Sequence, residues 1–111
     1  MKYCVEYTDA AVTDLKDIGQ YIATHDEPER ADYVINGIMR TVSRLQHSPF
    51  YARVPELLEY GVEQYRQVRW KPYRIIYEIQ ENNTVMIVAV IDGRRDVNEF
   101  LRQRFSIDGG T

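Results

Sequence analysis

The sequence predicts an α+β fold: a small, mostly antiparallel sheet with an N-terminal αα-hairpin packed on one side of it. Two observations predict this fold. Two stretches of apolar residues at helical spacing lie in the first half of the chain, and three stretches rich in β-branched and aromatic residues lie in the second half. With one strand before the helices and one short helix at the end, the expected order of elements is β-αα-βββ-α.

The chain is expected to open with a strand over residues 3–7, which are rich in aromatic and β-branched residues. Cys4 lies in this alternating run and is interpreted as a small core residue rather than a reactive thiol. Because it is the only cysteine of the chain, no internal disulfide can form.

Two helices should follow, over residues 9–24 and 28–47. Thr8 and Asp9 offer an N-cap for the first helix, and Pro28 stands in the first turn of the second, where a proline is well tolerated. Apolar residues recur at spacings of three and four, so each helix should bury one face against the sheet. The residues predicted to be buried there are Leu15, Ile18, Ile22, Ile35, Ile38, Val42 and Leu45.

The second half of the chain should supply the rest of the sheet. Residues 50–60 are irregular in pattern, whereas residues 64–68 and 73–79 are expected to be strands. Residues 85–91 form an almost continuous apolar run, which is typical of a strand buried on both faces. A short last helix is expected over residues 96–105, with its apolar residues on roughly one side.

By length the chain is one domain, which we assign to residues 1–107, with residues 108–111 as a frayed tail. No apolar run approaches the roughly 20 residues that a membrane span needs. The N-terminus lacks the apolar stretch of a secretory signal. We therefore expect a cytoplasmic protein that makes no membrane contact.

Charge is distributed unevenly along the chain. The net charge is −3 and the pI is about 5.4, which weighs against a generic nucleic-acid-binding protein. Residues 1–63 hold six Lys and Arg against eleven Asp and Glu, a net charge of −5, whereas residues 64–111 hold eight against six, a net charge of +2. The acidic half is interpreted as a solvated surface, and the basic half is the place to look for a site.

One basic cluster stands out in that second half. Four cations alternate with aromatic residues between positions 65 and 74, and two arginines follow the last expected strand. This pattern can present guanidinium groups and aromatic rings on one surface, which predicts a binding site for RNA, DNA or an acidic protein. Taken singly, each cation is better explained as one half of a surface ion pair, and only the set as a whole favours a binding surface. The predicted target-binding residues are Arg66, Arg69, Lys71, Arg74, Arg94 and Arg95.

The usual catalytic patterns are missing from the sequence. It contains no glycine-rich phosphate loop, no Cys/His spacing for a metal and no serine in a nucleophile-elbow pattern. His25 and His47 stand at predicted helix ends, where a cation is favoured by the helix dipole. We therefore expect no cofactor and no metal site.

Six segments match the pattern of one known family, and the overall likeness runs from the first strand to about residue 105. They cover residues 28–31, 45–49, 54–57, 61–62, 73–77 and 90–97. The most specific feature is Tyr-Arg-Ile-Ile-Tyr followed by Val-Ile-Asp-Gly-Arg-Arg-Asp, after a helical hairpin of this length. Together they resemble the RelE/ParE superfamily of toxins from bacterial type II toxin–antitoxin systems. The resemblance implies the fold predicted above, and a toxin that inhibits growth, stabilises plasmids and is neutralised by a cognate antitoxin.

The long helical hairpin and the ending Arg-Arg-Asp-Val look more like the ParE branch of this superfamily. ParE toxins are associated with inhibition of DNA gyrase and have no known catalytic chemistry, so the resemblance favours a gyrase inhibitor that is not an enzyme. RelE toxins cleave mRNA in the ribosomal A site, so the alternative is a ribosome-dependent endoribonuclease with the ribosome and mRNA as partners. A third interpretation is an inactive member retained to bind the antitoxin or to assemble a repressor.

Four positions bear on this choice. Arg69 and Arg94 match two RelE-type arginines that would stabilise the scissile phosphate, and they would be the catalytic residues of a nuclease. Phe100 falls where some RelE toxins have a reactive tyrosine, but phenylalanine has no hydroxyl to transfer a proton. Asp92 falls where many relatives carry histidine. These differences favour the gyrase inhibitor, expected as a homodimer within a toxin–antitoxin hetero-oligomer.

Overall fold

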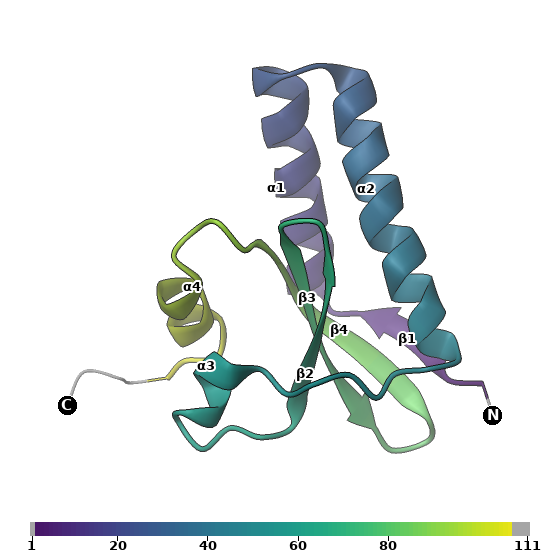
Figure 1. Cartoon of the computed structure of the whole chain (residues 1–111), viewed down its shortest axis with the longest axis vertical. Helices are drawn as coiled ribbons and strands as arrows, with labels where there is room; N and C mark the ends of the chain where they lie inside the picture. The colour runs from purple at the N-terminus through teal and green to yellow at the C-terminus, as the bar shows by residue number, and fades with distance from the viewer. Residues whose placement is uncertain (1, 108–111) are drawn as a thin grey trace.

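The computed structural model describes residues 2–107, which form one sheet with helices around it (Figure 1). The elements are, in chain order, β1 (Cys4–Tyr7), α1 (Asp9–His25), α2 (Pro28–Ser43), the 3-10 turn η1 (Arg44–Gln46), α3 (Pro55–Leu58), β2 (Tyr65–Trp70), β3 (Tyr73–Gln80), β4 (Thr84–Asp92) and α4 (Val97–Arg104). The tail predicted over residues 108–111 lies outside the described residues. No helix in the described part is long and apolar enough to cross a membrane.

The sheet has the strand order β1-β4-β3-β2. The pairs β4·β3 and β3·β2 are antiparallel, and β1 joins β4 in parallel. The predicted α+β fold, with its mostly antiparallel sheet and its β-αα-βββ-α order, is confirmed. One element was not predicted: α3 is a single helical turn that begins at Pro55, inside the segment expected to be irregular.

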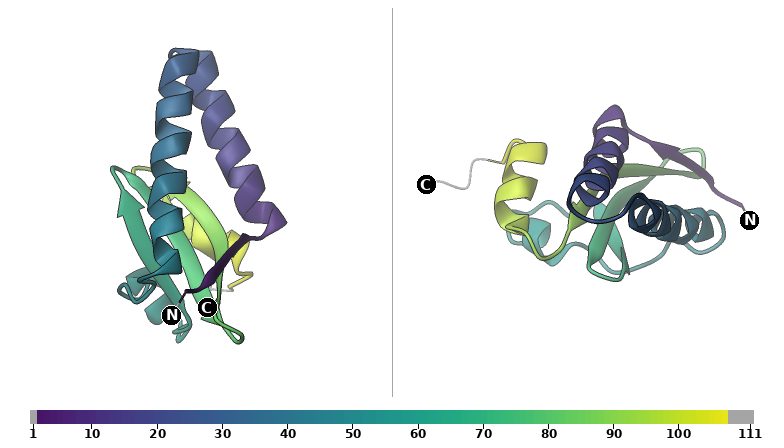
Figure 2. Two further views of the ribbon diagram at one scale, coloured as in Figure 1. Left: turned by 90° about the vertical axis from the view of Figure 1, so that its right-hand side faces the viewer. Right: turned by 90° about the horizontal axis from the view of Figure 1, so that it is seen from above.

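Helices cover both faces of the sheet: the αα-hairpin packs on one face, as predicted, and two short helices cover the other (Figure 2). α1 and α2 pack on one face, called here the hairpin face, to which Ile75 of β3 contributes. α3 and α4 pack on the other face, called here the opposite face, with Ile76 in that core. Successive strand residues point to different faces, and both isoleucines are 0% exposed, so each face needs an apolar cover.

The helical hairpin is anchored at its root and projects past the sheet at its tip (Figure 1). Ile38, at the root, is 0% exposed, as predicted. Four residues that were predicted to be buried are only half-buried: Leu15, Ile18, Ile22 and Ile35. Helical spacing identifies the face that the two helices share, but it cannot say how far the sheet extends beneath that face.

β1 is an edge strand whose alternate residues face the core. Tyr3, Val5 and Tyr7 contact the hairpin-face core, whereas Cys4 is exposed. The interpretation of Cys4 as a core residue is therefore wrong. Successive side chains of a strand point to opposite faces, so Cys4 points away from the core that its neighbours Tyr3 and Val5 contact.

An ion pair joins α1, β4 and α4. β4 carries an irregularity at Val88, which has no partner in the β3 register. Arg104 donates to the Val88 carbonyl at 2.9 Å and to the two carboxylate oxygens of Asp14 at 2.7 and 2.8 Å. Asp14 also accepts from the Val90 N–H at 2.9 Å. The carboxylate raises the pKa of Arg104, and the pair fastens the last helix to the first.

Candidate functional site

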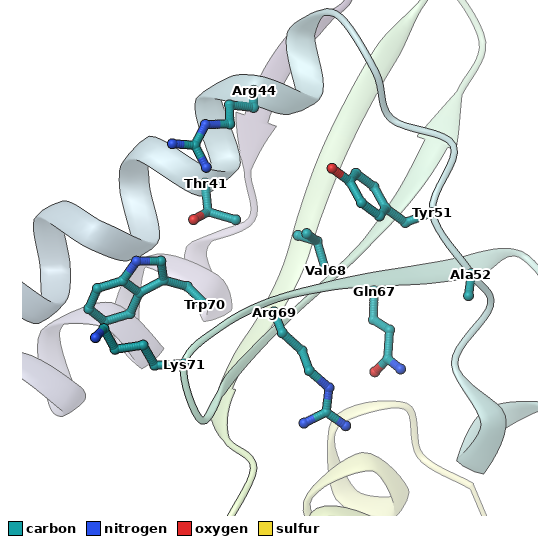
Figure 3. A pocket seen from close by; sticks show the side chains of 9 residues that line it. All are labelled: Thr41, Arg44, Tyr51, Ala52, Gln67, Val68, Arg69, Trp70 and Lys71. Atoms are coloured by element: carbon teal, nitrogen blue, oxygen red, sulfur yellow. The ribbon is translucent and has the colours of Figure 1, made fainter.

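The candidate site is built on the hairpin of β2 and β3. Arg69 stands opposite Arg74, and Trp70 stands opposite Tyr73. Opposed residues of an antiparallel pair share a face, and neighbours along a strand point to different faces. Trp70 therefore lies on the hairpin face and Arg69 on the opposite face, and Figure 3 shows the two side chains pointing to different sides of β2.

Lys71 and Pro72 form the two-residue turn between these strands. Lys71 has a φ of 53°, in the left-handed region that costs a residue with a Cβ roughly 1–2 kcal/mol. A tight hairpin turn requires a positive φ at its first central position. The Lys71 Nζ lies 5.5 Å from the ring centre of Trp70 and 5.7 Å from that of Tyr33, so its charge is held over two aromatic rings.

Trp70 is fixed in place by α2. Its indole lies so close to Gly37 that a Cβ at this glycine would overlap the ring. Tyr33 meets the indole edge-on with 5.5 Å between ring centres, and Tyr73 stacks on it at 6.4 Å. Trp70 is therefore enclosed by its neighbours and separates two hollows on this side of the molecule.

The larger hollow is the β2 groove, a cavity of about 510 Å³ between the C-terminal part of α2, the segment 51–52 and β2 (Figure 3). Its lining residues are Thr41, Arg44, Tyr51, Ala52, Gln67, Val68, Arg69, Trp70 and Lys71. Three of them are cations and none is a carboxylate. Within residues 2–107, Arg44, Arg69 and Lys71 form no ion pair.

A buried tyrosine fixes the outer wall of the β2 groove. The Tyr77 hydroxyl donates to the Pro49 carbonyl at 2.6 Å and accepts from the Tyr51 N–H at 3.4 Å. Burial raises the pKa of Tyr77 to about 12, so the hydroxyl remains protonated at neutral pH. Arg66 donates to the Tyr51 carbonyl at 2.6 Å and lies over the ring of Phe50, which ties the same segment to β2.

The second hollow, called here the tip hollow, measures about 400 Å³ and lies between the hairpin tip and the β2–β3 turn. Residues from both sides contribute to it, among them Tyr21, His25, Arg30, Lys71, Asp92 and Arg94. His25 stacks on Tyr21 with 4.1 Å between ring centres, and its Nδ1 lies 2.9 Å from the Tyr21 carbonyl oxygen. His25 thus interacts with the end of its own helix.

Arg74 does not lie on a surface that a target could reach, so its inclusion among the binding residues is corrected. It is 3% exposed and faces α3. Its guanidinium donates to both carboxylate oxygens of Glu56, at 2.7 and 2.8 Å, and its Nε donates to Gln67 at 2.8 Å. The hydrogen bonds from Arg74 lower the pKa of Glu56 and hold α3 against the sheet.

The two arginines that match RelE-type residues do not converge. Arg69 lies on the opposite face, where its charge helps to lower the pKa of Glu56. Asp92 stands opposite Tyr73 and so belongs to the hairpin face. Arg94 binds Asp92 there with two hydrogen bonds, from Nε at 2.9 Å and from Nη2 at 2.7 Å. The same contact lowers the pKa of Asp92.

The remaining predicted residues have separate positions. Arg95 is exposed in the turn after β4, and its backbone N–H donates to the Asp92 carbonyl at 3.0 Å. Phe100 is half-buried in the opposite-face core, with the guanidinium of Arg104 4.7 Å from its ring centre. The position that carries a reactive tyrosine in some RelE toxins is therefore a packing position here. No group of three or more His, Cys, Asp or Glu side chains suited to a metal ion occurs between residues 2 and 107.

Sequence reasoning missed the α2 side of the β2 groove. Thr41 and Arg44 lie in the predicted second helix, where the spacing pattern identifies only the apolar residues. Tyr51 lies in a segment predicted to be irregular. The available signal was the pair Phe50-Tyr51 directly after a proline, because adjacent aromatic residues outside regular structure are typical of a contact surface, and both side chains are exposed here.

Comparison with known proteins identifies relatives of this fold. A family model described as the ParE toxin of the type II toxin–antitoxin system, parDE, matches residues 5–97. No curated protein sequence matches the chain. Among solved structures, a chain of the chromosomal ParDE system of P. aeruginosa superposes with a TM-score of 0.65 and 20% identity, over 82% of this chain and 96% of that one.

Two RelE-related structures are similar at a lower level. A chain of the RelBE2 toxin–antitoxin complex of Mycobacterium tuberculosis gives a TM-score of 0.58 at 20% identity, over 83% of this chain and 92% of that one. A double mutant of the E. coli toxin RelE in the free state gives 0.57 at 13% identity, over 96% of this chain and 93% of that one. At these identities the superpositions show a shared fold and nothing finer.

Proposed function

The chain belongs to the ParE toxin family of type II toxin–antitoxin systems, and from this premise we propose that it inhibits DNA gyrase without catalysing a reaction of its own. The observation that supports the proposal most directly is the separation of Arg69 and Arg94. One lies on the opposite face, and the other lies on the hairpin face in an ion pair with Asp92.

A ribonuclease of the RelE kind needs several cations aimed at one phosphate. Removing one such charge-stabilising donor from an enzyme typically costs on the order of 100- to 1,000-fold in rate. Arg69 and Arg94 lie on different faces of the sheet, and Arg94 is bound to Asp92, so the two are not aimed at one phosphate in this structure. The arrangement therefore favours a protein that binds its target over one that cleaves it.

Proton transfer is also poorly provided for. Phe100 has no hydroxyl, and its ring packs in the opposite-face core. Asp92 is kept ionised by Arg94, which lowers the pKa of Asp92, so this carboxylate is a poor proton donor at neutral pH. Neither position supplies the acid that a leaving 5′-oxygen would need.

A cognate antitoxin is the second partner that we propose. Two of the similar structures come from systems named as toxin–antitoxin pairs, the ParDE system of P. aeruginosa and the RelBE2 complex of M. tuberculosis. A toxin of this family acts on a target in the cytoplasm, so we place the chain there. For the gyrase contact we propose the members of the predicted set that remain at the surface. They are Arg69, Lys71, Arg94 and Arg95, which are exposed, and Arg66, which is half-buried.

The test compares two purified targets with one toxin preparation. We expect the protein to inhibit supercoiling by gyrase, or to trap cleaved DNA, and to leave ribosome-bound mRNA intact. Lys71→Glu should weaken inhibition about tenfold or more because it reverses a charge at the contact. Lys16→Glu, on the exposed side of α1, is the charge-matched control and should inhibit like the wild type. Codon-positioned cuts in mRNA, lost in Arg94→Ala, would overturn the proposal in favour of a ribosome-dependent endoribonuclease.

A further inference from the structure

We propose that the tip hollow binds a small phosphomonoester, the class that includes sugar phosphates and mononucleotides, and holds its phosphate with Arg30, Lys71 and the Tyr73 hydroxyl. This inference goes beyond the proposed function, because it assigns a ligand to a surface that the proposed function leaves unused as a pocket. Three features of the hollow support it: a buried hydroxyl without a partner, two cations without a carboxylate, and a positive lining in an acidic chain.

The most informative group of the tip hollow is the hydroxyl of Tyr73. Tyr73 lines the hollow and is 7% exposed. Its hydroxyl takes part in no hydrogen bond with any residue from 2 to 107, whereas the hydroxyl of Tyr77, the other buried tyrosine there, both donates and accepts. A buried tyrosine hydroxyl usually finds a hydrogen-bond partner. Because the protein supplies none for Tyr73, this donor is available to a ligand.

Charged groups of the hollow act on this hydroxyl. Burial raises the pKa of Tyr73, the carboxylate of Asp92 raises it further, and the charges of Arg94 and Arg30 lower it. All three charged residues line the tip hollow, so the hydroxyl lies on the side of the ring that faces the hollow. With its pKa above the ordinary value, the hydroxyl keeps its proton at neutral pH and can donate it to an anion.

Two cations reach the hollow from different elements. Arg30 belongs to the first turn of α2, and Lys71 belongs to the turn between β2 and β3. The guanidinium carbon of Arg30 lies 5.2 Å, and the Lys71 Nζ 5.7 Å, from the centre of the same ring, that of Tyr33. Neither cation forms an ion pair with a described residue. Both charges are therefore within reach of one anionic group that enters the hollow.

The carboxylates of the hollow are already engaged. Asp92 accepts from the Arg94 guanidinium at 2.9 and 2.7 Å, and Asp26 accepts from the Glu27 N–H at 2.9 Å. The lining holds three cations and two carboxylates, which gives a net charge of +1 with histidine neutral, in a chain whose net charge is −3. The local balance of charge therefore favours an anion.

The arrangement of the donors fits a phosphate better than a carboxylate. The three donors come from α2, from the β2–β3 turn and from β3, so they approach from different directions. A phosphomonoester offers three acceptor oxygens and close to two negative charges, whereas a carboxylate offers two oxygens in one plane. The hollow measures about 400 Å³, which is within the range of small-ligand pockets. The rest of the ligand therefore has room against Tyr21 and Trp70, which also line it.

The surroundings of the hollow argue against a polynucleotide in the same place. Four exposed acidic residues lie at the hairpin tip beside the hollow: Asp26, Glu27, Glu29 and Asp32. A polynucleotide carries a phosphate on every unit and gains its affinity from many cations. Its further phosphates would meet these carboxylates, whereas a ligand with a single phosphate places its whole charge beside Arg30 and Lys71.

The test titrates the protein with ribose 5-phosphate at constant ionic strength, with ribose and acetate as controls. Trp70 is the only tryptophan of the chain and lines the hollow, so its fluorescence reports binding without a label. We expect saturable binding of ribose 5-phosphate with a change in the Trp70 emission. Acetate should bind at least about tenfold more weakly, because it has fewer acceptor oxygens and a smaller charge. Ribose, which has no charge, should produce no saturable change.

Substitutions within the hollow test the individual donors. Tyr73→Phe removes only a hydroxyl and should weaken binding of ribose 5-phosphate about tenfold, because a hydrogen bond to a charged group is lost. Its thermal unfolding should match the wild type, since the hydroxyl bonds to no described residue. Arg30→Ala should weaken binding by a similar factor. Arg40→Ala removes an exposed arginine from the same helix outside the hollow, and this control should bind like the wild type.

Several results would overturn the proposal for the tip hollow. Wild-type affinity in Tyr73→Phe would show that the buried hydroxyl does not contact the ligand. Equal losses in Arg30→Ala and Arg40→Ala would reduce the effect to the overall charge of the protein. Equal binding of acetate would leave no selection of phosphate. Tighter binding of a short DNA duplex than of ribose 5-phosphate, with the same Trp70 response, would assign the hollow to a polynucleotide instead.

Discussion

The buried and the exposed cations around the sheet use their charges in different ways. On the opposite face, Arg74 is buried against Glu56, and at the end of the same layer Arg104 is bound to Asp14. Each of these cations is neutralised by a carboxylate of this chain. Along the β2 groove, Arg44 has no such partner within the described residues, although the chain as a whole is acidic.

This difference follows from the cost of burying charge. An ion removed from water must regain its interactions inside the protein, so a buried arginine requires a carboxylate and further acceptors. An exposed arginine has no such requirement, so it can stay unpaired, as Arg69 does within the described residues, or pair at the surface, as Arg94 does with Asp92. Arg69 and Arg74 illustrate the two cases, because they are directly opposed on β2 and β3. α3 covers Arg74 and leaves Arg69 exposed. Cation count therefore says little about a binding surface, and exposure decides which cations belong to it.

The largest effect is expected for Arg74→Ala. It leaves Glu56 without its two charge-assisted hydrogen bonds and Gln67 without its donor. Breaking a buried pair by removing one partner costs roughly 3–5 kcal/mol. Because Glu56 keeps a side-chain exposure of 26%, we expect the lower end of that range. Urea unfolding followed by circular dichroism measures the loss.

Arg69→Ala is the matched control for that substitution. It removes the same side chain from the directly opposed position on the neighbouring strand, where it is exposed and unpaired in the described structure. The free energy of unfolding should change by no more than about 0.5 kcal/mol. Equal destabilisation by the two variants would show that burial does not separate the two arginines in the way described.

Ile38→Ala should cost roughly 2–5 kcal/mol, because it opens a cavity in the hairpin-face core where the side chain is 0% exposed. Ile22→Ala, near the tip of the same hairpin, should cost clearly less, since Ile22 is only half-buried and the site is open to solvent. Thermal unfolding of the two variants gives the comparison. A larger loss at Ile22 would contradict the anchored root and projecting tip of the hairpin.

The fold was largely predictable because it depends on local patterns. Spacing of three and four residues located both helices, and the β-branched runs located β3 and β4 within one residue at each end. What the patterns do not contain is the extent of one element beneath another. The half-burial of Ile18 depends on where the sheet ends, and the exposure of Cys4 depends on which residues of an edge strand face inward.

The site was predictable only in its composition. The cluster of cations and aromatic residues around Trp70 was recognisable in the sequence, but the face of each side chain depends on strand register. Register separates Arg69 from Arg94 and buries Arg74 beneath α3. The sequence gives little indication of α3, because this helix has only four residues and begins at a proline. Arg44 joins the groove only because η1 continues α2 past β2, a contact between residues distant in sequence.

Gly37→Ala tests the rigidity of the wall between the two hollows. A Cβ at this position would overlap the indole of Trp70, so the ring must move, at a cost of roughly 1–3 kcal/mol for overpacking. A shift of Trp70 emission towards longer wavelength is the expected result. Gly19→Ala is the control, because its Cβ would meet Ile35 at an ordinary 3.6 Å and alanine favours a helix. The indole emission should be unchanged there.

The smallest effect is expected at the β2–β3 turn, where Lys71 adopts a left-handed backbone. Lys71→Gly and Lys71→Ala remove the same cation, so the difference in their free energies of unfolding measures the backbone strain alone. The glycine variant should be the more stable by about 1 kcal/mol, because alanine keeps the Cβ that this conformation penalises. At Lys16, in the middle of α1, the order should reverse by about the same amount, since glycine disfavours a helix. If both Lys71 variants also lose gyrase inhibition, the lysine is kept for its charge at a position where the backbone favours glycine. Equal stabilities at position 71 would remove the evidence for strain and leave Lys71 as an ordinary turn residue.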